Sequence, residues 1–244
     1  MMMHRYQVCY SKEEEMKYIS HLDLQRTVSR VLRRARIPVA FSQGFNPQPR
    51  LVFAAPLAVG IEGKNEYLEL YLTDKWEEEQ LKKALGDEFP AGLNVKSVAS
   101  VDLEGPTLSA LVEAALYAAL FTDLPQESSA ILQGILNAEE IIVARRGKKG
   151  DNSKSKEIDI RPFIFALEMN RQVASAGGDP VPSLLMLLAT GSRGGARPED
   201  IMSLLPPEME AVKIYRENIF IRRRGGERLL TPEGIYSEDY LKRG

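Results

Sequence analysis

The 244-residue sequence is poor in side chains that bind transition metals, since it has one cysteine and two histidines. A single cysteine, Cys9, excludes an internal disulfide. Together with His4 and His21 it supplies too few ligands for a zinc or iron–sulfur site within the chain. We therefore predict no metal and no cofactor, and any metal chemistry would belong to a partner.

Long apolar runs are also missing. The longest, residues 108–121, contains Glu113 and is shorter than the ~20 residues that a transmembrane helix needs. The N-terminus leads directly into a strand-like pattern, without the apolar core of a signal peptide. These features predict a cytoplasmic protein with no membrane partner.

The composition is otherwise that of a globular protein, with 44% hydrophobic and 27% charged residues. The length allows one large domain or two small ones, and two domains are our working prediction. A net charge of −2 does not suggest a general nucleic-acid binder, but an average conceals local patches.

Residues 1–104 follow the order strand, helix, strand, strand, helix, strand. The second and third strands are expected to pair as a hairpin after a Gly/Pro/Asn-rich turn, and the second helix to end at Gly86. The expected elements are strand 5–11, helix 20–36, extended run 51–55, strand 66–72, helix 76–85 and strand 93–101. This order predicts a ferredoxin-like unit, in which two helices cover one face of an antiparallel sheet.

Residues 105–225 can be divided in the same way, although the alanine-rich segment 109–121 could equally be helical. The expected elements are strand 109–121, helix 126–137, strands 140–146, 158–169 and 184–190, helix 198–205, and a strand or hairpin at 212–224. The predicted fold class is α+β, with two tandem ferredoxin-like (βαββαβ) units, antiparallel sheets and a polar C-terminal tail at 226–244.

The helix predicted at 20–36 has an apolar stripe and, on the opposite arc, an arginine face. This face consists of Arg26, Arg30, Arg33 and Arg34. From Ser20 to Arg50 the chain has six arginines and one acid, Asp23, so the segment carries a local charge of +5. Such a face can bind an anion or nucleic acid, contact a protein, or form salt bridges with the acidic region 77–79.

The start of this helix has the spacing of a capping box, in which Ser20 and Asp23 satisfy backbone N–H groups. This structural interpretation is favoured for Asp23 over a catalytic one. His21 falls nearer the apolar side, which favours a buried or boundary histidine over a general base.

The loop that follows combines hydroxyl and amide side chains with a glycine and two prolines. Such a loop can hold polar groups in a fixed array toward a phosphate or a base edge. The candidate anion ligands in and after it are Ser42, Gln43, Asn46 and Arg50. Phe45 could stack on an exposed base; the favoured alternative places its ring in the core.

Four motifs in the first half resemble the radical-SAM-linked domain of unknown function 2344. They are Ser20-His21-Leu22-Asp23-Leu24-x-Arg26, Leu32-Arg33-Arg34-Ala35-x-Ile37-Pro38, Ser42-x-Gly44-Phe45-Asn46-Pro47-x-Pro49 and Pro56-Leu57-x-Val59-Gly60. The resemblance continues at 156–162 and 197–200 and so covers most of the chain. It implies a bacterial-type accessory to a radical-SAM protein. The chain itself lacks the Cys-x-x-x-Cys-x-x-Cys cluster of such an enzyme.

A second basic segment, 145–161, has a net charge of +4, from seven basic and three acidic residues. It is either a solvated loop or an arm that orders on a phosphate-bearing ligand. Asp159 and Arg161 are expected to form an ion pair on one strand face. The further candidate anion ligands are Lys148, Lys149, Arg161 and Arg193.

Three functions are compatible with these features. The first is an accessory protein that binds tRNA or rRNA and lacks independent activity. The second is an RNA-acting enzyme of pseudouridine-synthase-like or endoribonuclease-like architecture, with Asp23 or Asp159 as its carboxylate and His21 as its base. The third is an interaction subunit that docks on a radical-SAM enzyme. RNA and a radical-SAM protein are thus the expected partners.

Overall fold

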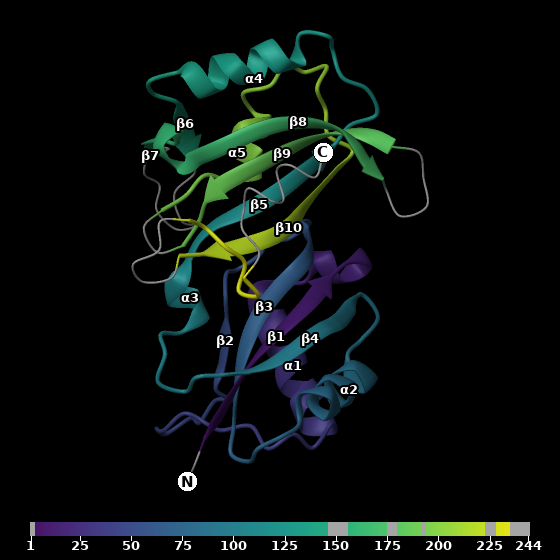
Figure 1. Cartoon of the computed structure of the whole chain (residues 1–244), viewed down its shortest axis with the longest axis vertical. Coiled ribbons are helices and arrows are strands. Elements are labelled where there is room, and N and C mark those ends of the chain that lie inside the picture. The colour runs from purple at the N-terminus through teal and green to yellow at the C-terminus, as the bar shows by residue number, and fades with distance from the viewer. Residues whose placement is uncertain (1–2, 146–155, 175–179, 192–193, 223–227, 235–244) are drawn as a thin grey trace.

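Strands from both halves of the chain form one mixed sheet of eight strands (Figure 1). The computed structural model describes residues 3–145, 156–174, 180–191, 194–222 and 228–234. Across the sheet the strands run in the order β4-β1-β3-β10-β5-β9-β8, and β2 pairs with β3 beside this path. The α+β class predicted from the sequence is confirmed.

The N-terminal half supplies four antiparallel strands in the order β4-β1-β3-β2. Its elements are β1 (His4–Lys12), the 3-10 helix η1 (Glu14–Tyr18), α1 (His21–Arg34), β2 (Leu51–Phe53), β3 (Glu62–Leu72), α2 (Glu78–Glu88) and β4 (Leu93–Val101). Both helices pack on one face of these strands, where Val31 and Leu32 of α1 meet Leu81 of α2 in a single buried cluster. Apolar residues spaced three and four apart produce this packing.

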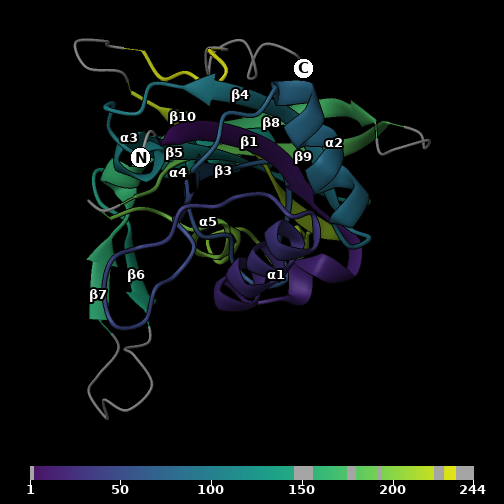
Figure 2. The same ribbon diagram turned by 90° about the horizontal axis from the view of Figure 1, so that it is seen from below.

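The C-terminal half supplies four strands in the order β10-β5-β9-β8. Its elements are α3 (Leu108–Leu111), β5 (Val112–Leu120), α4 (Ser128–Asn137), β6 (Ile142–Arg145), β7 (Lys156–Asp159), the 3-10 helix η2 (Arg161–Phe163), β8 (Ile164–Ala174), β9 (Pro180–Ala189), α5 (Pro198–Met202) and β10 (Lys213–Ile221). Strands β6 and β7 form a separate hairpin that projects from the main sheet, and α5 lies on the same side of that sheet as α1 (Figure 2).

The two halves join where β3 and β10 run parallel, with Glu62 opposite Tyr215 and Gly63 opposite Arg216. Arg216 is fully buried there and makes two hydrogen bonds to the Glu66 carboxylate, of 2.8 and 2.5 Å. A Cβ atom on Gly63 would lie 2.4 Å from Glu66 Oε1, so this position has no room for a side chain. A buried ion pair therefore lies at the junction of the halves.

Several predicted elements are confirmed, including the β2–β3 hairpin, strand β4 and helix α4. The single strand predicted at 158–169 is wrong, because Pro162 lies in η2, which separates β7 from β8. The helix predicted to end at Gly86 continues to Glu88. Segment 109–121 is helical only in its first residues and then forms β5.

Residues 228–234, expected to belong to a polar tail, pack against the body. Leu230 forms an isolated antiparallel β-bridge with Ile221, and Thr231 is fully buried. Glu233 accepts a hydrogen bond of 2.8 Å from the Ser97 hydroxyl. Within the described ranges no helix is both long and apolar enough to cross a membrane.

Candidate functional site

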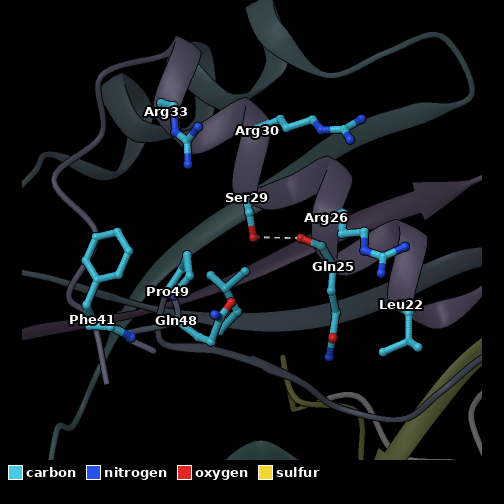
Figure 3. Close-up of a pocket in the computed structure, with 11 residues that line it drawn as sticks. Leu22, Gln25, Arg26, Ser29, Arg30, Arg33, Phe41, Gln48 and Pro49 are labelled. Atoms are coloured by element: carbon cyan, nitrogen blue, oxygen red, sulfur yellow. Dashed lines mark hydrogen bonds between the residues drawn. The ribbon is translucent and has the colours of Figure 1, made fainter. Parts of the chain in front are cut away.

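An open groove of about 780 Å³ separates α1 from the segment that leads into β2 (Figure 3). It brings three arginines of the predicted face together with residues 47–49 on the returning side of the predicted loop. The predicted loop ligands Ser42, Gln43, Asn46 and Arg50 are not among the residues that line it. The residues that line it are Leu22, Gln25, Arg26, Ser29, Arg30, Arg33, Phe41, Pro47, Gln48, Pro49 and Leu51. We call this site the α1 groove.

Helix α1 begins at a side-chain cap. Ser20 Oγ accepts a hydrogen bond of 3.2 Å from the Asp23 backbone N–H, which satisfies one donor of the first turn. The Asp23 carboxylate accepts hydrogen bonds from Ser20 Oγ at 2.7 Å and from Arg26 at 3.0 Å. These bonds lower the pKa of Asp23, which is therefore a structural anion in the first turn of α1.

The end of α1 turns the chain back along the groove. Arg36 has a positive φ of 55°, the Arg36 N–H donates to Arg33 O at 3.2 Å, and the Ile37 N–H donates to Leu32 O at 3.0 Å. These two bonds and the left-handed residue make up a Schellman motif. A non-glycine residue pays a conformational cost in this position.

The four arginines of the predicted face have different partners. Arg26 is paired with Asp23, and Arg34 reaches out of the groove to Glu88, with Nε 2.7 Å from Oε2. Arg34 therefore pairs with the last residue of α2, and not with the acidic region 77–79 before and at the start of that helix. Arg30 and Arg33 are exposed and have neither an ion pair nor a hydrogen bond to any residue that the structure describes. The uncompensated charge of the groove is therefore theirs.

The loop opposite α1 is closed at its base by backbone and side-chain bonds. The Ser42 N–H donates to Gln48 O at 2.8 Å, and Ser42 Oγ accepts from the Gln48 N–H at 3.0 Å. Phe41 and Pro49, the residues flanking this pair, form an isolated antiparallel β-bridge. Ser42 is thus occupied in shaping the loop, while Gln43 and Asn46 are exposed at its tip.

The Phe45 side chain is fully exposed, with a relative accessibility of 106%. The favoured prediction that its ring is in the core is therefore wrong. Arg50, after the loop, is half-buried, since its guanidinium lies 4.2 Å above the Tyr71 ring and donates to Met3 Sδ at 3.2 Å.

The candidate catalytic residues have structural contacts. His21 packs edge-on against Phe53, with ring centroids 5.2 Å apart, and burial followed by the charge of Lys12 lowers its pKa. Asp159 accepts hydrogen bonds of 2.9 Å from the backbone N–H groups of Ile141 and Arg161. We therefore assign neither His21 as a catalytic base nor Asp159 as a catalytic carboxylate.

The Arg161 side chain donates hydrogen bonds to two carbonyl oxygens at the C-terminal end of α4 and to one at the start of β8. The acceptors are Leu136, Ala138 and Ile164, at 2.6, 3.1 and 3.2 Å. Its guanidinium does not form the predicted ion pair with Asp159 but caps the helix. Lys148, Lys149 and Arg193 lie outside the described residues. Among the residues that are described, no group of three or more His, Cys, Asp or Glu could hold a metal ion.

Of the eleven groove residues, only Arg26, Arg30 and Arg33 are among the candidate ligands predicted from the sequence. The other eight are Leu22, Gln25, Ser29, Phe41, Pro47, Gln48, Pro49 and Leu51. Leu22 and Phe41 are large apolar residues with 62% and 54% exposure, and they lie at opposite ends of the groove (Figure 3). The signal for Leu22 and Gln25 was helical spacing, because they share a face with Arg26 and Ser29. No local pattern marks Phe41, whose position depends on the closed loop.

Comparisons with known proteins place the sequence in a family. The family described as "Uncharacterized protein conserved in bacteria (DUF2344)" matches residues 5–198. No curated protein matches the chain. Among solved structures, the chain is similar to one described as "Crystal Structure of an Unknown Protein from Galdieria sulphuraria", with 12% identity and a TM-score of 0.26, over 78% of this chain and 84% of that one. A score this low carries no argument about function.

Proposed function

The chain belongs to the DUF2344 family of proteins conserved in bacteria, and from that premise we propose that it is an accessory protein that binds RNA through the α1 groove. The observation that carries this proposal is the pair Arg30 and Arg33. Both are exposed in the groove and neither has a partner among the described residues. Unpaired guanidinium groups bind phosphate oxygens well because their planar donors match phosphate geometry.

The other groove residues support a nucleic acid over a small inorganic anion. Gln48 supplies an amide group and Phe41 an aromatic surface. Gln25 supplies a second amide, whose Nε2 also lies 3.1 Å from His21 Nε2. Phosphate contacts position such a ligand, while amides and rings contact its bases.

The strand orders of the two halves support a separate proposal, which concerns the fold. The two halves have equivalent strand orders, β4-β1-β3-β2 and β10-β5-β9-β8. If the main-sheet strands of each half are numbered one to four along the chain, both orders read 4-1-3-2. This is the order of a ferredoxin-like unit. We therefore propose that each half is such a unit, and that the α1 groove belongs to the first.

The proposal is tested with matched arginine variants and labelled bulk tRNA. Arg30→Gln/Arg33→Gln removes the two unpaired charges, whereas Arg34→Gln/Lys83→Gln removes two charges that are paired and do not line the groove. We expect the first variant to bind more weakly and to lower the slope of log K against log salt by roughly 1.4 to 1.8, because each lost phosphate contact contributes about 0.7 to 0.9. The second variant should retain most of the affinity.

Absence of binding to bulk RNA at about 50 mM salt would refute the proposal. Equal losses in the two double variants would also refute it. The partnership with a radical-SAM protein is a separate proposal that rests on the family resemblance alone. Its test is recovery of that enzyme with the untreated protein and again after ribonuclease treatment, which removes contacts bridged by RNA.

A further inference from the structure

Two exposed phenylalanines belong to the segment opposite α1. Phe41 lines the groove at 54% exposure, and Phe45 extends from the tip at 106%. The fully exposed Phe45 ring contributes little to folding, because it removes almost no apolar surface from water.

The tip that carries Phe45 is closed by the paired backbone of Ser42 and Gln48. Pro47 and Pro49 fix further backbone angles on the returning side of the loop. This closed base anchors the tip, from which the Phe45 side chain extends into solvent.

Aromatic side chains and unpaired arginines on facing walls are the two elements that proteins use to bind unpaired nucleotides. Bases stack on the rings regardless of sequence, while guanidinium groups contact the backbone phosphates. We infer that the α1 groove binds a single-stranded or looped RNA segment, with phosphates at Arg30 and Arg33 and bases stacked on Phe41 and Phe45. This inference rests on the proposed RNA binding and names the class of RNA.

A continuous RNA duplex does not fit this arrangement as well. The bases of a duplex are stacked on one another, so their faces cannot cover an aromatic ring. Duplex recognition would use the arginines and leave both phenylalanines without a role.

An anionic membrane is the other ligand that attracts exposed aromatic and basic residues. Membrane insertion requires a broad apolar surface beside the basic one. The neighbours of Phe45 in the tip are polar, namely Gln43 and Asn46, and Phe41 lies beside a groove and not on a convex face. These features favour RNA.

The test compares a labelled single-stranded RNA of mixed sequence with the same strand in a blunt duplex. We expect the single strand to bind more tightly. Phe45→Leu keeps the tip apolar but removes the stacking face, and should weaken single-strand binding by about 5- to 150-fold per lost base contact. Phe165→Leu, which changes a phenylalanine of β8 with 44% exposure, is the matched control and should change nothing.

A second readout does not depend on affinity. Phe45→Trp should retain binding, and its emission should be quenched by the single strand as a base stacks on the indole. The native chain contains one tryptophan, the half-buried Trp76, whose emission should change little in the parent protein.

The outcomes separate this inference from the proposed function. If the duplex binds as tightly as the single strand, or if Phe45→Leu has no effect while Arg30→Gln/Arg33→Gln weakens binding, RNA binding stands and the inference is overturned. If neither RNA form binds, both are overturned. Binding to phosphatidylserine vesicles that is lost in Phe45→Leu, without RNA binding, would identify a membrane contact in its place.

Discussion

The ion pair between Glu66 and Arg216 offers the sharpest test of how the two halves are joined. Their side chains have 4% and 0% exposure, and Arg216 also donates to the carbonyl oxygens of Ala55 and Pro56 at 3.0 and 3.1 Å. Glu66→Gln leaves a buried guanidinium without its counter-charge, and Arg216→Met leaves a buried carboxylate without its donors. Breaking a buried pair in this way costs about 3–5 kcal/mol of the free energy of unfolding.

The double variant Glu66→Gln/Arg216→Met removes both charges. It should therefore be more stable than the sum of the single effects predicts, with a coupling energy on the order of 3 kcal/mol. The two carbonyls still lose a donor, so the double variant should remain less stable than the parent protein.

Urea denaturation followed by Trp76 fluorescence and by circular dichroism measures these free energies. Trp76 reports on the first half and dichroism on the whole chain, so coincident transitions would indicate that the halves unfold together. The control is Asp87→Asn, which breaks the Lys83–Asp87 pair, whose side chains are 75% and 61% exposed. Its expected cost is below about 0.5 kcal/mol.

Additive single effects, or a cost for Glu66→Gln no larger than that for Asp87→Asn, would refute this reasoning. Additivity would mean that the two side chains do not stabilise each other. An equal cost would mean that burial of the pair has no energetic consequence.

Two further predictions concern backbone strain and pH. Arg36→Gly should be more stable to urea than Arg36→Ala by about 0.5–1 kcal/mol, because glycine adopts the left-handed conformation at the end of α1 without strain; equal stability would contradict this. Burial raises the pKa of the Cys9 thiol from 9.0 to about 12. The contribution of the neutral thiol to the free energy of unfolding is therefore complete below pH 9. It is lost as the pH rises toward 12, by up to about 1.4 kcal/mol per pH unit. The free energy of unfolding should therefore fall less steeply between pH 8 and 10.5 in Cys9→Ala than in the parent protein, and identical slopes would contradict this explanation.

Local sequence determined the features whose causes lie within a few residues. The apolar and arginine faces of α1 follow from helical spacing, and the cap at Ser20 needs only Asp23 three residues later. The β2–β3 hairpin likewise follows from a turn between two adjacent segments. Family motifs could also be recognised at this level.

Only the tertiary structure decided which arginines remain unpaired. Arg34 is paired because Glu88, 54 residues later, lies beside it. Arg161 caps a helix that ends 24 residues earlier, at Asn137. The identity of such partners depends on how segments far apart in the sequence meet in space. No local sequence pattern specifies which of them meet.

The α1 groove shows the same division. Sequence determined the arginine wall and the residue types of the loop, because both are local. The exposure of Phe45, the position of Phe41 and the joining of β3 to β10 depended on long-range packing, since burial is a property of neighbours that come from other parts of the chain. The sequence therefore provided the chemistry of the candidate site, and the fold decided which of its side chains are free to contact a ligand.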